Sequence, residues 1–306
     1  MRIYWSPNIR LLLVLMVLGV CSWRCQQAPT DASVASPDAA RADTDNINHD
    51  GGVVQYTIPP NTSRTSSIRI FSYQIGTTAT SRVTADLFDQ SPPNTTRISA
   101  SDPASSCTVL VTEFDPRVGL PVFADAGPIS VIGGLSPIEI FFNDVNYAAY
   151  ASGDSALFTG GETLQLTAVG GSKIGAFSTE LTAPTNLQLT SPSIAPGNAL
   201  DITRSDQLTF QWTGGNADTS TQVHIKTRPP EATFVDILCS WPSTLGEGSI
   251  PLMVMQKLPA GAGTITVRAI NATSTMVEDW GPIECIAETP ATTPDGFPVD
   301  VEVDIK

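Results

Sequence analysis

Apolar and polar residues alternate along most of the chain beyond residue 52. The alternation has a period of two in TLQLT (163–167), QLTFQW (207–212) and TITVRA (264–269), so successive side chains would point to opposite faces of a strand. No long window keeps the 3.6-residue apolar repeat of an amphipathic helix. Short runs of this kind recur, with Gly, Pro, Asn and Asp between them. The pattern predicts an all-β protein.

The length of the alternating part favours two β-sandwich domains in tandem. A join is visible at FSTELTAPTNLQLTSP (177–192), where Pro184 separates two candidate strands. We therefore predict one domain at residues 53–183 and a second at 184–289. In the first domain, Gly133 and Gly134 of PISVIGGLSPIEIFF favour a hairpin, because glycine adopts the positive φ of a tight turn.

Residues 290–306 read as a Pro-rich linker followed by a C-terminal strand or tail. In PVDVEVDIK, apolar residues occupy every second position from Val299 to Ile305, and acids occupy the positions between them. A last strand lying on the sandwich is the favoured interpretation. A tail free in solution, or a strand added to another protein's sheet, remains an alternative.

The N-terminal segment has the three parts of an export signal. Arg2 and Arg10 supply the basic region, and LLLVLMVLGV (11–20) supplies an apolar region. This run is shorter than the roughly 20 residues that a helix needs to cross a bilayer. Residues 1–20 are therefore predicted to be a signal peptide.

The stretch LGVC, Leu18 to Cys21, resembles the lipobox of bacterial lipoproteins, in which the cysteine is lipidated and becomes the new N-terminus. Val20 departs from the pattern, since Gly, Ala or Ser normally stands there. The resemblance implies a lipid on Cys21. Ser22, in place of Asp, implies the outer membrane, with the protein facing the periplasm or the cell surface. Ordinary cleavage to a secreted protein, or an uncleaved anchor, remains possible.

Residues 21–52 are predicted to be a disordered tether. From residue 26 onward this segment has no aromatic residue and is rich in Ala, Asp, Pro, Thr and Ser. Such a composition cannot bury enough apolar surface to fold.

The chain is acidic, with 30 Asp and Glu against 16 Lys and Arg and a formal net charge of −14. Cleavage of the signal would remove Arg2 and Arg10 and make the charge more negative. An acidic surface repels phosphate backbones, so nucleic acid is excluded as a partner. The few lysines form no cluster that would hold an anionic membrane. Membrane attachment would therefore come from the lipid alone.

Three cysteines lie beyond the N-terminal region: Cys107, Cys239 and Cys285. In an oxidising exterior they permit one disulfide with three possible pairings. We favour Cys239 with Cys285 because both fall within the proposed second domain. Three small buried hydrophobic thiols are the alternative.

The second domain resembles a fibronectin type III module. The resemblance rests on APTNLQL (183–189), QLTFQW (207–212), QVHIK (222–226) and LPAGAGTITVRAIN (258–271). It implies an immunoglobulin-like β-sandwich with Trp212 in the core between the sheets. The connection at 190–206 is unusually long, and the strand with Ile265 lacks the tyrosine that forms the family's corner hydrogen bond. Such modules host many roles, so the resemblance implies little about function.

The sequence offers no catalytic constellation. Only His49, in the tether, and His224, in a predicted strand, could act as neutral-pH bases. The chain has neither a G-x-S-x-G elbow nor an H-E-x-x-H motif. We therefore predict no catalytic residue, no bound metal and no cofactor.

Two oxygen-rich segments are candidate calcium sites. NINHDGGVVQYT (46–57) imitates an EF-hand loop, but Thr57 stands where a bidentate Glu should close the site. Asn143, Asp144, Asn146 and Asp154 form the second group. A flexible linker and an ordinary loop are the favoured interpretations, and calcium is the minor one.

Trp241 and Trp280 are candidate ligand-stacking residues, because each lies near a proline at a strand end. The favoured alternative is that both cap the cores. Paired carboxylates of a glycosidase cannot be judged from sequence spacing.

The leading functional hypothesis is a non-enzymatic envelope lipoprotein that acts as a binding or structural module, with an unidentified protein or glycan as partner. A carbohydrate-binding or weakly glycoside-active accessory module is one alternative, and a calcium-stabilised adhesin is another.

Overall fold

The computed structural model describes residues 66–75, 78–90, 95–102, 106–113, 122–143, 146–153, 156–195, 197–227 and 233–306. The predicted signal peptide, Cys21, the tether and the loop 46–57 lie outside these residues. No helix within the described ranges is long and apolar enough to cross a membrane.

Nearly all regular secondary structure in the described chain is β-strand, which confirms the predicted fold class. Helical structure among these residues consists of a one-turn helix α1 (Leu252–Met255) and a 3-10 turn η1 (Ser243–Leu245). The strands follow the period-two pattern, as in β9 (Thr163–Ala168), where Leu164, Leu166 and Ala168 are buried between more exposed polar residues. Because alternate side chains are apolar, each such strand buries one face.

Twelve strands form one large sheet, whose central order is β3-β4-β15-β14-β17-β18-β1-β2-β5, with β19 on β17, β12 on β19 and β8 on β2. Their bounds are β1 (Ser66–Ile75), β2 (Thr78–Gln90), β3 (Thr95–Asp102), β4 (Cys107–Glu113), β5 (Val122–Phe123), β8 (Tyr147–Gly153), β12 (Leu200–Ile202), β14 (Ser220–Thr227), β15 (Thr233–Pro242), β17 (Gly261–Val277), β18 (Gly281–Pro290) and β19 (Asp300–Ile305).

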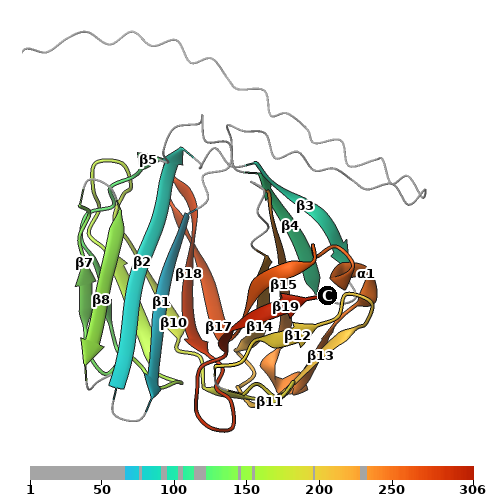
Figure 1. Cartoon of the computed structure of the whole chain (residues 1–306). Coiled ribbons are helices and arrows are strands. Elements are labelled where there is room, and N and C mark those ends of the chain that lie inside the picture. The colour runs from blue at the N-terminus through green and yellow to red at the C-terminus, as the bar shows by residue number, and fades with distance from the viewer. Residues whose placement is uncertain are drawn as a thin grey trace, which may run out of the picture. The chain divides into compact units, whose positions relative to one another are not determined.

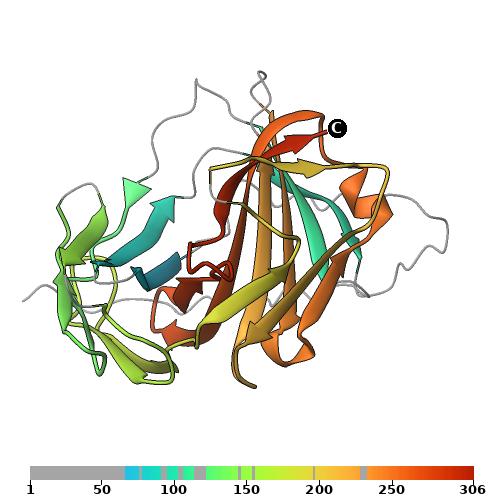
Figure 2. The same ribbon diagram turned by 60° about the horizontal axis from the view of Figure 1, so that its bottom comes forward.

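Two smaller sheets pack on the large one. Four strands form the first: β6 (Ile129–Ile132), β7 (Ile138–Ile140), β9 and β10 (Phe177–Thr182). Three form the second: β11 (Leu187–Ser191), β13 (Leu208–Gly214) and β16 (Glu247–Ile250). In Figure 1, β17 and β18 lie between β1 and β2 on one side and β14 and β15 on the other. Figure 2 shows these red strands from another side, between the blue strands and the orange ones.

Each small sheet encloses a hydrophobic core against the large sheet. The first core joins Ile68, Ile70 and Val83 of the large sheet to Leu164 and Leu166 of β9. The second core joins buried residues of β14, β15 and β17 to β11, β13 and β16. Two β-sandwiches therefore share one large sheet.

Both cores lie on the same face of that sheet. β17 has unbroken pairing with its neighbours, and its core residues all occupy odd positions. Ile265, Val267 and Ala269 belong to the second core, and Val277 belongs to the first. Because alternate strand residues point to opposite faces, even positions of β17 lie on the other face, which we call the outer face.

Neither core is confined to one side of the predicted boundary at residues 183 and 184. Cys107 and Val109 of β4 belong to the second core, while Ile283 and Cys285 of β18 belong to the first. The reason is long-range pairing, since β18 runs parallel to β1 and β4 pairs with β15.

Several local predictions are confirmed. Trp212 is 3% exposed in the second core. β6 and β7 form the predicted antiparallel hairpin, although only Gly133 has a positive φ, of 93°. The tail forms β19, with Val303 and Ile305 buried, and it is paired on both sides, by β12 and β17.

Candidate functional site

Charged and aromatic side chains gather on the outer face where β1 and β2 lie beside β17 and β18. On β1, Arg69, Phe71 and Tyr73 alternate with core residues, so all three belong to the outer face. Arg82 of β2 is directly opposite Phe71, and its guanidinium lies over the Phe71 ring at 5.4 Å from the ring centre. This is a cation–π arrangement.

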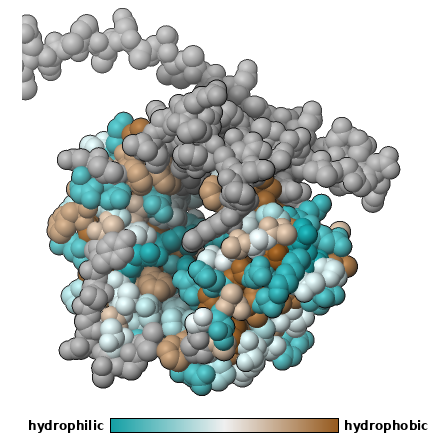
Figure 3. Space-filling view, viewed as in Figure 1, coloured by the Kyte–Doolittle hydropathy of each residue, from teal (hydrophilic) through white to brown (hydrophobic). Residues whose placement is uncertain are grey.

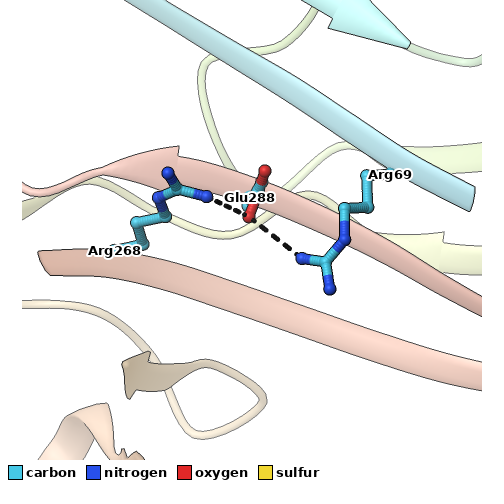
Figure 4. Close-up of polar contacts among 3 residues, drawn as sticks. All are labelled: Arg69, Arg268 and Glu288. Carbon is cyan, nitrogen blue, oxygen red and sulfur yellow. Dashed lines mark hydrogen bonds and ion pairs between the residues drawn. The ribbon is translucent and has the colours of Figure 1, made fainter. Parts of the chain in front are cut away.

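A buried carboxylate lies beside these residues. Glu288 of β18 is opposite Phe71 on one side and Ile270 on the other, and it is 0% exposed. Its Oε2 accepts a hydrogen bond of 3.0 Å from Arg268 of β17 and lies 3.6 Å from a guanidinium nitrogen of Arg69. Figure 4 shows both guanidinium groups directed to this one oxygen. The Oε1 atom is buried and has no hydrogen-bond partner among the residues that the structure describes.

The two arginines make the burial of Glu288 tolerable. A buried charge without a partner costs several kcal/mol, roughly 3–5 when one partner of a buried pair is removed. The side chain of Glu288 is 1% exposed, whereas those of Arg69 and Arg268 are 39% and 27% exposed. Water therefore reaches the cations but not the anion. The cluster as a whole carries one positive charge when Glu288 is ionised.

A cleft of about 270 Å³ opens next to this cluster. Its lining combines two arginines, two aromatic rings, a carboxylate and an apolar wall: Phe71, Tyr73, Thr80, Arg82, Arg268, Pro290, Pro298, Val299 and Asp300. Arg268 thus joins the cleft to the buried Glu288. Figure 3 shows hydrophilic and hydrophobic residues interspersed over the described part of the molecule in that view. Such a mixture of apolar wall and few polar groups is typical of small-molecule sites.

The structure places both predicted stacking residues in the cores. Trp241 and Trp280 are each 7% exposed. Trp241 lies with its ring centre 6.1 Å from that of Trp212, and Gly248 lies so close to the Trp241 ring that a larger residue there would clash with it. Trp280 donates a hydrogen bond of 2.8 Å to the Ser66 hydroxyl. Their position near prolines did not bring them to the surface, so the structure corrects the ligand-stacking interpretation.

The predicted disulfide pair is wrong. Cys107 and Cys239 face each other across β4 and β15 and are bonded, whereas Cys285 is a free, buried thiol of the first core. Burial raises the pKa of the Cys285 thiol to about 12, with a smaller contribution from Glu284. The prediction failed because it assumed that each cysteine stays within one linear domain.

The other sequence candidates assemble no site in the described ranges. His224 is a partly exposed strand residue, as predicted, with its Nε2 3.5 Å from an Asp236 oxygen. The Asn143 side-chain amide donates a hydrogen bond to Asn146 Oδ1, and the Asn146 backbone amide donates one to Asn143 Oδ1, which fits an ordinary loop. Asp144 and Asp154 lie outside the described residues. Within the described part, no three His, Cys, Asp or Glu side chains are close enough to hold a metal ion.

Sequence reasoning missed the cleft. Its residues come from strands that are far apart in the chain, and an arginine at an outer-face position looks like any solvated strand residue. One signal was present in the sequence of β18, GPIECIAETP. Its residues from Cys285 to Pro290 are all buried, and Glu288 is the charged residue among them. A charge in a buried run indicates a partner nearby.

These features define an all-β protein with two sandwiches on a shared sheet and a cationic cleft on the outer face. No protein-family model and no curated protein matches the chain. Among solved structures, the chain is similar to the fibronectin(III)-like modules of Clostridium thermocellum CbhA, with 13% identity over 66% of this chain and 86% of that one. The TM-score is 0.20, which is too low to support an argument, so the fold assignment rests on the strands and cores described above.

Proposed function

We propose that the chain is a non-enzymatic binding protein of the bacterial cell envelope, and that it binds its partner through the cleft on the outer face. The observation that carries this proposal is the cleft's composition. Two arginines and two aromatic rings line it in a chain of net charge −14, so the local charge is opposite to that of the whole protein. A site of contrasting charge attracts ligands that the rest of the surface repels.

The same proposal places a lipid on Cys21 and residues 21–52 between the membrane and the folded part. Its support is the export signal followed by LGVC and the acidic segment 26–52, which has no aromatic residue. Mass spectrometry of the mature N-terminus tests it, with an acylated Cys21 expected. A free N-terminus further along would show a secreted protein instead.

The partner remains a protein or a glycan. The carbohydrate-binding alternative loses its predicted stacking platform, since Trp241 and Trp280 belong to the cores. Tyr73 and Phe71 in the cleft are the aromatic groups that a glycan could still contact.

Binding is tested with immobilised protein and fractionated envelope proteins and glycans. The double variant Arg82→Ala, Tyr73→Ala should lose what the wild type captures. Lys226→Ala, which removes an exposed cation of β14 away from the cleft, should retain it. Capture that is unaffected by the cleft variant would place binding elsewhere, and no capture from either fraction would reject the binding role.

A further inference from the structure

The charges around the cleft point to a particular kind of ligand. Arg82 has no acidic partner in the part of the chain that the structure describes, and its guanidinium lies over the Phe71 ring. Arg69 and Arg268 share the single carboxylate of Glu288. Asp300 is the remaining charged group of the lining. With both acids ionised, the cleft and the cluster beneath it retain one unbalanced positive charge.

The contacts of Glu288 show which guanidinium donors a ligand can use. Both Arg69 and Arg268 approach the same oxygen, so their guanidinium groups keep donors that Glu288 does not use. Arg268 lines the cleft and is held in place by its 3.0 Å hydrogen bond. Arg82 is held over the Phe71 ring. Two positioned guanidinium groups can donate charge-assisted hydrogen bonds to a bound anion.

The rest of the wall is apolar or aromatic. Tyr73, Pro290, Pro298 and Val299 supply this surface beside the arginines. The volume of about 270 Å³ lies near the lower end of ligand pockets, which favours a ligand of about one ring. A neutral molecule would bury part of the arginine surface without compensation. A dianion would leave an excess negative charge near Asp300.

We infer that the cleft binds a monoanionic organic group of the partner, with its carboxylate at Arg82 and Arg268 and its ring or apolar body against Tyr73 and the prolines. This inference rests on the proposed binding function and specifies its ligand class.

Three probes of similar shape and different charge test whether the cleft prefers a monoanion: benzoate, benzamide and phenyl phosphate. Each is titrated into the mature full-length protein, and binding is followed by NMR chemical shifts. Benzoate should bind saturably and at least about tenfold more tightly than benzamide, because a lost charge-assisted hydrogen bond has roughly that effect. Phenyl phosphate should bind more weakly than benzoate. Equal binding of benzoate and benzamide, or tighter binding of phenyl phosphate, overturns the inference.

The variant Arg82→Gln locates the site. It keeps the side chain polar and leaves the Glu288 cluster intact, so the protein should fold, and benzoate should bind about tenfold more weakly or worse. Lys226→Gln is the matched control and should bind benzoate as the wild type does. If Arg82→Gln has no effect on benzoate binding, the site is wrong.

The two proposals fail differently. If no probe binds but envelope capture still depends on Arg82, the ligand class is wrong and the binding function stands. If capture does not depend on Arg82 and Tyr73, binding lies elsewhere on the protein, and the proposed use of the cleft fails together with the inference.

Discussion

Glu288 is a buried carboxylate on the outer face, and two arginines compensate its charge. Its carboxylate is shielded from water, while the two arginines that neutralise it are partly exposed. The energetic roles of the partners are therefore unequal. An arginine that loses Glu288 can be solvated, but Glu288 left without Arg268 keeps only a 3.6 Å contact with Arg69.

This difference in exposure predicts which of two substitutions lowers the free energy of unfolding more. Arg268→Ala should lower the free energy of unfolding by about 3 kcal/mol, because it leaves a buried carboxylate poorly compensated. Glu288→Gln should lower it by only about 1 kcal/mol, since it removes the buried charge and keeps the shape. Urea denaturation measures both, with Arg82→Ala as a control of small effect. A larger loss for Glu288→Gln than for Arg268→Ala would contradict this account.

Asp125 fixes a turn in the first sandwich. Its Oδ1 accepts hydrogen bonds from the Gly127 amide at 2.8 Å and the Tyr147 hydroxyl at 3.1 Å, and its Oδ2 accepts one from the Ser172 amide. The Gly127 amide is the main cause of a pKa for Asp125 below its ordinary 3.8, followed by the Ser172 amide. Burial opposes the shift, and Tyr147 reinforces it.

A lowered folded-state pKa stabilises the fold above the unfolded-state pKa, and the stabilisation is lost as the pH falls through the folded value. Asp125→Asn should therefore be less stable than the wild type at pH 7. The difference should shrink as the pH falls below about 3.8. Thermal unfolding at a series of pH values checks this, and a difference that stays constant down to pH 2 would show that the charge of Asp125 plays no part.

At the scale of the elements, the disulfide joins the β3–β4 hairpin to the second sandwich. Cys107 and Cys239 lie on β4 and β15 and are 132 residues apart in the chain. A bond between distant residues restricts the unfolded chain, which typically contributes about 2–4 kcal/mol. Cys107→Ser should lower the unfolding free energy by that amount, and reductant should no longer change the variant's melting temperature. Cys285→Ala is the control, since it removes a free thiol and leaves the bond intact, so reductant should still lower its melting temperature. A non-reducing peptide map that links Cys239 to Cys285 would reject the pairing.

The strands also show which features of the fold can be predicted from the sequence. Period-two alternation predicts strands such as β9, β13 and β19, because it reports which side chains one strand buries. The alternation does not indicate which other strand each strand pairs with. The parallel pairing of β1 with β18 and the pairing of β4 with β15 join distant parts of the chain, and they decide which cysteines meet. The cleft follows from the pairing of β1 with β18, because β2 pairs with β1 and β17 pairs with β18, so Arg82 of β2 and Arg268 of β17 reach one site.

At the scale of the whole molecule, β17 and β18 connect the two sandwiches. β17 contributes Ile265, Val267 and Ala269 to the second core and Val277 to the first. β18 pairs with β17 along Gly281–Pro290 and with β1 in parallel. Unfolding of one sandwich would therefore expose a strand that the other sandwich needs.

This sharing predicts that residues 66–306 unfold in one cooperative transition. Leu166→Ala should weaken the first core, and Phe210→Ala should weaken the second, by about 3–4 kcal/mol each, since both side chains are fully buried. Because each core depends on β17, either variant should shift a single calorimetric transition to lower temperature without splitting it. Lys226→Ala, at an exposed position of the same sheet, should leave the transition nearly unchanged. Two resolved transitions, each sensitive to one variant only, would mean that the sandwiches unfold independently, and the shared strand would then be a hinge between two separate cooperative units.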